Sequence, residues 1–291
     1  MLWDQMITFL KSFFVYEGVG WDLMLITIAL AIAFGAVWLC AHWIPLMKKP
    51  QLWGVMVSSA ILTLLAVTFI QIPLQHYAGT ALNKLWDSST LANWLLLAGI
   101  PSVLISGLVQ EGAKMVPMVV WWWRSGKTIT PKLGLAIGAA AGAGFGIFEA
   151  IWAIGNTYAA GWTTQYISQY GFLGISPFWE RFFAIGFHIA VSALVGYGLA
   201  KGKGWQFYLI AAGLHALLNY GVVVYQYFAF IRNSNIITPT RLEIYIAVLA
   251  VIIAAVVMML RWRKSREETP GGPAAPPMEP IEPVKTAETG V

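Results

Sequence analysis

Six chemically active side chains stand in stretches of sequence that are otherwise apolar. They are Glu111, Lys114, Glu149, His188, His215 and Asn219. A carboxylate held in an apolar site has a raised affinity for its proton and can act as a general base near neutral pH. A neutral imidazole can orient a water or bind a metal, and an amide can donate a hydrogen bond to a developing oxyanion. These residue types together predict a site that activates water.

The composition places these residues in a membrane. The chain has 291 residues, of which 58% are hydrophobic and 11% are charged, whereas a soluble domain has about 25% charged residues. Several windows of about 20 residues contain no charge, and this is the length that crosses a bilayer core. The sequence therefore predicts an all-α fold, a polytopic integral membrane helical bundle in which a charge inside a span marks a functional site.

The sequence predicts about seven transmembrane helices. They run over about Asp22–Ile44, Leu52–Leu74, Leu91–Trp123, Leu133–Gly155, Phe178–Ala200, Trp205–Ile231 and Leu242–Trp262. The third would be roughly 48 Å long, which is too long for one upright helix. We expect it to be tilted or to break at Pro101 and Pro117.

Three parts of the chain differ in composition. Residues 1–20 predict an interfacial amphipathic segment, because Asp4 and Lys11 interrupt its apolar run and no small-residue cleavage site follows. Residues 21–262 predict a membrane-embedded helical domain, with the site region at 91–220. Residues 263–291 are basic and then rich in Pro, Gly and Glu, which predicts a disordered cytoplasmic tail.

Lysine and arginine are unequally divided between the two sets of helix ends. One set holds Lys48, Lys49, Arg124, Lys127, Lys132, Lys201, Lys203, Arg261, Arg263, Lys264 and Arg266, and the other holds Lys11, Lys84, Arg181, Arg232 and Arg241. The positive-inside rule then predicts a multi-pass cell-membrane protein with its N-terminus outside and its C-terminus in the cytoplasm. These loops explain most of the net charge of +5, so nucleic-acid binding is not needed. The single Cys40 excludes an intramolecular disulfide and a Cys-based zinc cluster.

Four consecutive spans each carry an acid or an imidazole at depth. Glu111, His188 and His215 lie about ten to twelve residues, or roughly 15–18 Å, from a helix end. Asn219 is one turn after His215 on the same face. A structural hydrogen bond between helices is the alternative for either histidine alone, but it does not explain the joint pattern.

The fourth span has glycines at every fourth position. They are Gly134, Gly138, Gly142 and Gly146. Such a seam lets another helix approach closely, and Glu149 continues the same face. Its carboxylate should therefore point into the bundle, the alternative being an interfacial glutamate that reaches water. We expect the side chains of Glu111, Glu149, His188 and His215 to line one polar cavity.

Four short motifs occur in order on these spans. They are QEGAK (Gln110–Lys114), FGIFE (Phe145–Glu149), HIAVSALVG (His188–Gly196) and HALLN (His215–Asn219). Over Leu91–Tyr220 the chain resembles the PrsW and YhfC branch of the intramembrane proteases related to the CAAX prenyl-protein peptidases. The resemblance implies hydrolysis of a peptide bond in a membrane-associated protein, and hence an intramembrane endopeptidase of the glutamic or the metallo type.

The resemblance also implies roles for single residues. Glu149, His188, His215 and Asn219 fall on later motif positions and become catalytic candidates, as does Glu111, the second glutamate of the first motif. Three residues become supporting candidates: Gln110, Lys114 and Phe145. Gln110 departs from the pattern, because the family has a glutamate there and a glutamine cannot serve as a base. Lys114, one turn from Glu111, would compensate its charge, although a purely structural ion pair is the alternative.

The sequence leaves the cofactor open. Glu149, His188 and His215 would make a three-ligand set for a divalent metal such as zinc, with Glu111 as base. A metal-free site, in which a glutamate and His188 activate the water, is equally consistent. Two other functions also stay open: a transporter coupled to protons or metal ions, and a catalytically inactive scaffold that binds other membrane helices. The interpretation as a protease implies a membrane-anchored peptide substrate within the lipid bilayer.

Overall fold

The computed structural model describes residues 2–267, and every regular element in this part of the chain is a helix. Seven helical segments are long and apolar enough to cross a bilayer, which confirms the predicted all-α bundle. They are α2 (Trp21–Leu39), α4 with α5 (Gln51–Ala66, Ile72–Leu85), α7 with α8 (Leu95–Ala98, Ile100–Arg124), α9 (Pro131–Ala159), α11 (Phe172–Ala200), α12 (Gly204–Gln226) and α13 (Pro239–Glu267). The shorter elements are α1 (Leu2–Ser12), η1 (Cys40–His42), α3 (Trp43–Lys48), η2 (Val67–Gln71), α6 (Ser88–Asn93), α10 (Gln165–Tyr170) and η3 (Tyr227–Ile231).

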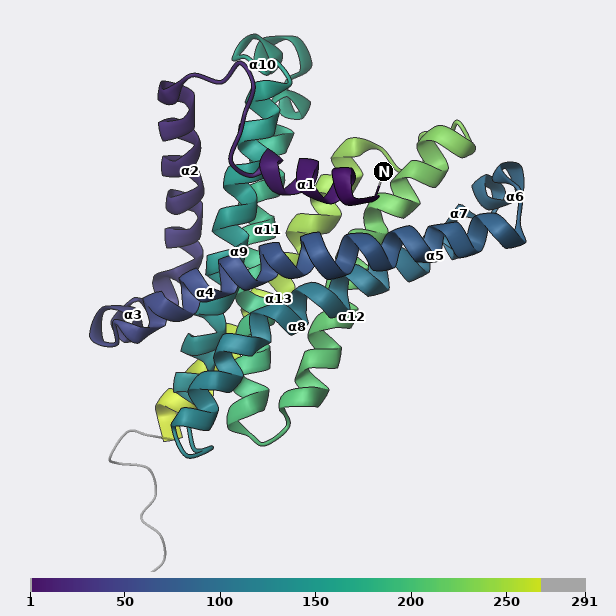
Figure 1. Cartoon of the computed structure of the whole chain (residues 1–291). Helices are drawn as coiled ribbons and strands as arrows, with labels where there is room; N and C mark the ends of the chain where they lie inside the picture. The colour runs from purple at the N-terminus through teal and green to yellow at the C-terminus, as the bar shows by residue number, and fades with distance from the viewer. Residues whose placement is uncertain (1, 268–291) are drawn as a thin grey trace, which may run out of the picture.

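The second span is longer than predicted and continues from α4 through η2 to the end of α5 at Leu85. Figure 1 shows it crossing the upright helices α2 and α11 at a steep angle. The five residues of η2 form a π-helical turn just before Pro73, which is in the first turn of α5. A proline ring clashes with the carbonyl four residues earlier, and a widened turn relieves this clash. The polar residues after Leu74 therefore do not end the helix.

The third span breaks at one of the two places that the sequence predicts. The helix is interrupted around Trp94 and Gly99, and α8 then starts afresh with Pro101 in its first turn. A proline is tolerated there because the first N–H groups of a helix have no partner in any case. The expected break at Pro117 is wrong, because α8 runs through it to Arg124. Neighbouring helices support such a proline inside a membrane bundle.

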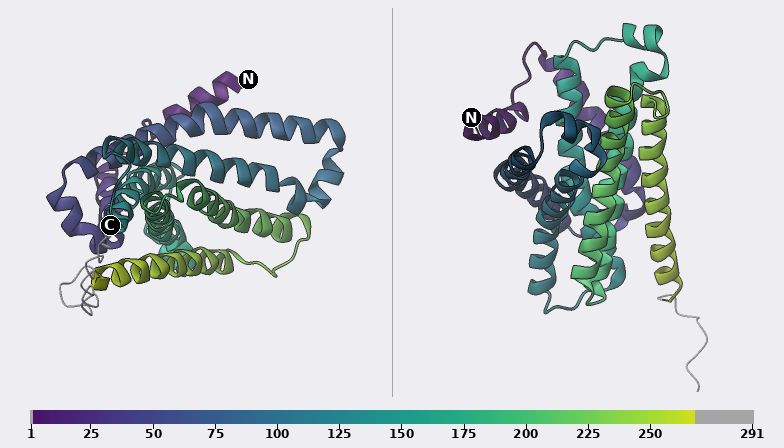
Figure 2. Two further views of the ribbon diagram at one scale, coloured as in Figure 1. Left: turned by 90° about the horizontal axis from the view of Figure 1, so that it is seen from below. Right: turned by 90° about the vertical axis from the view of Figure 1, so that its right-hand side faces the viewer.

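Helices α9 and α11 form the centre of the bundle. Most of their middle residues are buried, and the other spans surround them (Figures 1 and 2). The four glycines of α9 face α11, and a Cβ atom at Gly138 would overlap the carbonyl oxygen of Ser192. The seam therefore brings the two backbones into direct contact, as glycines do between membrane helices.

The α8–α9 and α11–α12 turns lie at one end of the molecule, where the C-terminal end of α13 also emerges (Figure 1). These two turns carry several of the lysines that the sequence assigns to the cytoplasmic side. The N-terminal ends of α2 and α11 lie at the other end of the bundle, where α10 packs against α11 (Figure 1). The predicted tail lies, from residue 268 onward, outside the described residues.

Helix α1 occupies the predicted interfacial segment and packs along the bundle. The Phe13 ring that follows it stacks on Trp152 of α9 with 5.1 Å between ring centroids. The Trp152 indole N–H donates to the Ser12 hydroxyl over 2.9 Å. Trp3 contacts Phe69 of η2 at 6.5 Å between centroids. Aromatic contacts of this kind fix the segment against α9 and the π-helical turn.

Candidate active site

Close packing of α8 on α12 brings Glu111 to His215. A Cβ atom at Gly107 would overlap the carbonyl oxygen of Ala212, so the two backbones touch at this point. Glu111 is one turn after Gly107, and His215 is three residues after Ala212. Side chains three or four residues apart lie on the same helix face, so both point toward the place where the helices meet.

Close packing of α9 on α11 fixes His188 in the same way. A Cβ atom at Gly142 would overlap the His188 carbonyl oxygen, and one at Gly146 would lie 3.3 Å from the His188 Cβ. The Phe145 ring meets the His188 imidazole edge to face, with 5.4 Å between centroids. The glycine seam and this phenylalanine leave the imidazole few alternative positions, because a packed interior has little free volume.

Glu111 is the centre of the cluster. Its Oε1 atom lies 2.5 Å from the Lys114 ammonium and 2.6 Å from Nδ1 of His215. Its Oε2 atom is buried without a hydrogen-bond partner among the described residues. The Glu111 and Lys114 side chains are both 0% exposed. A buried carboxylate oxygen without a partner is costly, and such a group commonly marks a functional site.

His188 connects Glu111 to Glu149. Its Nδ1 atom lies 3.0 Å from the Lys114 ammonium, and its Nε2 atom lies 3.2 Å from Oε2 of Glu149. An ammonium only donates hydrogen bonds, so Nδ1 accepts, and the ring proton on Nε2 is donated to Glu149. The contacts therefore select one tautomer of neutral His188 and direct its lone pair toward Lys114.

Arg181 is a residue of this site that the sequence analysis assigned to an outer helix end. Its guanidinium lies 3.2 Å from Oε2 of Glu149 and also pairs with Glu180. Arg181 is only 14% exposed, so it lies inside the bundle. The missed signal is its spacing: it comes seven residues, or two turns, before His188 and so shares a face of α11 with it.

Gln110 and Asn219 belong to a neighbouring polar group. The Gln110 amide donates to Gln71 over 3.1 Å and to Ser106 over 3.2 Å. The Asn219 amide donates to the same Ser106 hydroxyl over 3.0 Å. These bonds tie η2, α8 and α12 together beside Glu111. Gln110, the departure from the family pattern, therefore points toward Gln71.

Three side chains are placed as metal ligands would be. Ligand atoms of Glu111, His188 and His215 all lie within 4.8 Å of one another. One carboxylate and two imidazoles are a typical ligand set of catalytic zinc. The residues thus fit a divalent metal. The sequence predicts Glu149 as the carboxylate ligand. In the structure, the Glu149 carboxylate contacts Nε2 of His188 instead.

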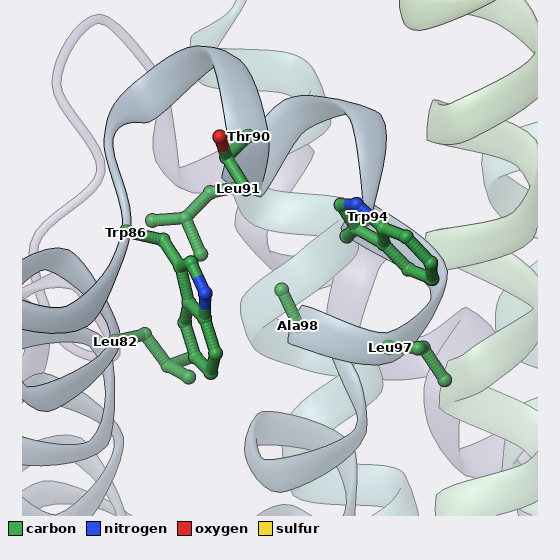
Figure 3. Close-up of a pocket in the computed structure, with 7 residues that line it drawn as sticks. All are labelled: Leu82, Trp86, Thr90, Leu91, Trp94, Leu97 and Ala98. Carbon is green, nitrogen blue, oxygen red and sulfur yellow. The ribbon is translucent and has the colours of Figure 1, made fainter.

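Two of the hollows in the described part of the bundle bear on the position of the site. A pocket of about 260 Å³ sits where α5 meets α6 and α7 (Figure 3). Tryptophans and leucines line it and none of its lining residues is titratable, so it cannot perform this chemistry. An apolar groove of about 710 Å³ runs between α4 with η2 and α8, and its α8 wall includes Gly112 and Ala113. The groove thus follows the helix that carries Glu111.

The comparison with protein families gives one match. The family described as PrsW family intramembrane metalloprotease matches residues 51–260. The matched stretch is more than half of the chain and contains the four helices that carry the cluster. It confirms the resemblance that the motifs indicate. No curated protein and no solved structure matches the chain.

Proposed function

The chain belongs to the PrsW family of intramembrane metalloproteases, and we propose that it hydrolyses a peptide bond of a membrane-anchored protein with a water activated by Glu111. The observation that carries this proposal is the Oε2 atom of Glu111, which is buried and has no hydrogen-bond partner within residues 2–267. A water on this oxygen would give up its proton to the carboxylate as it attacks the peptide carbonyl.

Two neighbours keep Glu111 in position for this role. Lys114 and His215 both contact its Oε1 atom, which fixes the carboxylate and leaves Oε2 for the water. The ammonium also compensates the negative charge, and a buried carboxylate needs such a partner. A proton taken up by Glu111 can then pass to the leaving amine, since a general base acts as a general acid in the second half of the reaction.

The other half of the site holds His188 through Glu149 and Arg181. In this proposal Arg181 positions Glu149, and Glu149 fixes the tautomer of His188 through Nε2. Outer partners that orient a histidine in this way affect activity almost as much as the histidine itself. Asn219 uses one amide hydrogen on Ser106, and its second can be donated to the oxyanion that develops on the substrate carbonyl.

A divalent metal would be held by Glu111, His188 and His215. When bound, it would polarise the peptide carbonyl and make the attacking water more acidic. The chain's own residues would still orient the substrate and move its protons. The groove between α4 and α8 would let an apolar peptide segment reach α8 from the bilayer.

Gln110 does not remove the base that this proposal needs. The Gln110 side-chain nitrogen donates to Gln71 and Ser106. Gln110 and Glu111 each have a buried oxygen without a partner among the described residues, but the amide oxygen of Gln110 is not basic, whereas the carboxylate oxygen of Glu111 is. The catalytically inactive alternative would leave that oxygen without a role. The transporter alternative would use the same acids and imidazoles as a proton or ion path.

Reconstitution separates these functions. The purified chain is placed in liposomes with a set of single-span peptides, and new peptide termini are identified by mass spectrometry. We expect cleavage inside or beside the apolar segment, and no cleavage by a His188→Ala, His215→Ala double variant. A pH-sensitive dye inside the same liposomes tests for transport. Proton flux that depends on Glu111, without any cleavage, would replace this proposal with the transporter.

We also propose that the N-terminus lies outside the cell and that the C-terminus is cytoplasmic. The proposal rests on the uneven distribution of lysine and arginine and on the shared end of the two basic turns (Figure 1). A cysteine introduced in the α11–α12 turn, in a chain lacking Cys40, should resist membrane-impermeant labels in intact cells. Labelling there from outside would reverse the orientation.

A further inference from the structure

The Lys114 ammonium lies between two of the three candidate metal ligands. Its Nζ atom is 2.5 Å from Oε1 of Glu111 and 3.0 Å from Nδ1 of His188. The lysine side chain is completely buried. The centroid of the Phe145 ring lies 5.9 Å from the ammonium. A positive charge built into the chain thus occupies the centre of the cluster.

His188 cannot serve Lys114 and a metal at the same time. Its Nε2 atom faces Glu149, so Nδ1 is the nitrogen directed into the cluster. A neutral imidazole has one lone pair, and on Nδ1 this lone pair accepts the hydrogen bond from Lys114. A metal bound to Nδ1 needs the same lone pair, so the hydrogen bond and the metal bond exclude each other.

Distances around Glu111 lead to the same conclusion. A zinc ion lies about 2.1 Å from a carboxylate oxygen. For an ion bound to Oε1 of Glu111, the 2.5 Å between that oxygen and Nζ is added to this distance, so the ion would lie no more than about 4.6 Å from the ammonium. Two positive charges at that distance in a buried site repel strongly.

We propose that Lys114 and a divalent cation are alternative occupants of the Glu111, His188 and His215 cluster. With Lys114 in place, the ammonium holds the carboxylate and His188 together without a metal. Metal binding requires the lysine to withdraw from Nδ1 of His188. The inference rests on the proposed site, but its test measures metal binding, so it can fail while the proteolytic function stands.

A different arrangement would make Lys114 a bystander. If the metal used Oε2 of Glu111 and approached His188 from another side, the lysine would stay on Oε1. Lys114 would then support the ligand geometry, and its removal would weaken metal binding or leave it unchanged. The two arrangements predict opposite results for the same substitution.

The test is zinc affinity of the full chain, measured in detergent at one pH by competition with a chromogenic chelator. Lys114→Met keeps the length of the side chain and removes its charge. We expect Lys114→Met to bind one zinc at least about tenfold more tightly than the unmodified chain, which is the usual size of such neighbouring effects. Lys201→Met makes the same chemical change at an exposed turn and should leave the affinity unchanged. Adding His215→Ala to Lys114→Met should abolish the gain.

Equal or weaker zinc binding by Lys114→Met would overturn the proposal, and so would the failure of both chains to bind zinc. Thermal unfolding establishes whether the variant is folded, and Lys114→Leu replaces it if it is not. A second readout uses the unmodified chain. The NMR signal of its buried lysine side chain should shift when stoichiometric zinc is bound. An unchanged signal with zinc bound would contradict the exclusion.

Discussion

Glu111 and Glu149 are two carboxylates of one site with different surroundings. Glu111 is completely buried, and its two cationic or imidazole partners both contact Oε1, so that Oε2 stays free. The Glu149 side chain is 21% exposed, and Arg181 and His188 both contact its Oε2 atom. The role of an acid inside a bundle therefore depends on the atoms around it, since Glu111 keeps an oxygen without a partner among the described residues in a part of the bundle where water is scarce.

The two halves of the site also differ in how they are held. The α8–α12 half depends on one close approach, at Gly107, and on the Glu111–Lys114 pair. The α9–α11 half depends on a seam of glycines and on the guanidinium of Arg181. His188 is the link, because its two ring nitrogens face the two halves. The loss of catalytic rate caused by a substitution should therefore be smaller the farther the residue lies from His188.

The largest of these effects is expected at His188. His188→Ala breaks both contacts at once, and loss of one acid-base or orienting group typically lowers the rate about 10²–10⁴-fold. The measurement is kcat for a single-span peptide in liposomes, with thermal unfolding as a check on folding. His188→Gln keeps a donor for Glu149 and should recover only a small part of the rate. If a folded His188→Ala protein had native turnover, catalysis would not require His188 to link the two halves of the site.

A smaller effect is expected at Arg181. Arg181→Met removes the guanidinium that contacts the Glu149 carboxylate. This carboxylate should then orient His188 less firmly. We expect kcat to fall about 10–100-fold. KM should change little, because the side chain does not face the α4–α8 groove. Arg181→Lys keeps the charge and should restore part of the rate. Lack of any rescue by lysine would indicate that Arg181 only stabilises the fold.

The glycine seam offers a matched pair of substitutions. Gly134→Ala and Gly142→Ala each direct a methyl group at a carbonyl oxygen of α11, that of Gly196 and that of His188 respectively. Overpacking of this kind costs about 1–3 kcal/mol, so both should unfold at lower temperature. Only Gly142→Ala moves His188, and its residual activity should be the lower of the two. Equal activities would show that the seam matters for packing alone.

Much of the fold and the identity of the site residues can be predicted from the sequence, but the contacts of their individual atoms cannot. The apolar windows, the glycines and the family motifs predict the bundle and place Glu111, Glu149, His188 and His215 in its interior. Spacing along one helix cannot tell which oxygen of a carboxylate meets which partner, because this depends on the approach of a second helix. The proton-bearing nitrogen of His188 and the position of the Lys114 ammonium therefore come only from the structure.

Arg181 and Pro117 show why charge and proline patterns mislead here. Arg181 resembles an interfacial charge because it is near the start of its predicted span, but α11 begins earlier, at Phe172. This places Arg181 inside the helix and beside Glu149. Pro117 resembles a break, but packing inside the bundle supports the helix on both sides of it. Tertiary contacts decide both cases.

The smallest effect on rate is expected in the amide group beside the site. Gln110→Leu removes the hydrogen bonds to Gln71 and Ser106, and leaving such groups buried without partners costs about 1–3 kcal/mol. The unfolding temperature should fall while kcat changes little. The amide oxygen of Gln75 accepts from Gln71 over 3.5 Å, and Gln75 is less buried than Gln110, so Gln75→Leu should cost less. A large loss of kcat in Gln110→Leu at native stability would give Gln110 a catalytic role.

The most direct test of the account compares Glu111→Gln with Glu149→Gln. Both substitutions keep the shape of the side chain and remove the negative charge, so they differ only in which carboxylate is lost. kcat is measured on the same single-span peptide in liposomes, with folded protein in each case. We expect kcat to fall about 10²–10⁴-fold in Glu111→Gln and by less, about 10–100-fold, in Glu149→Gln. Native turnover by Glu111→Gln, or a larger loss for Glu149→Gln, would contradict the assignment of Glu111 as the base.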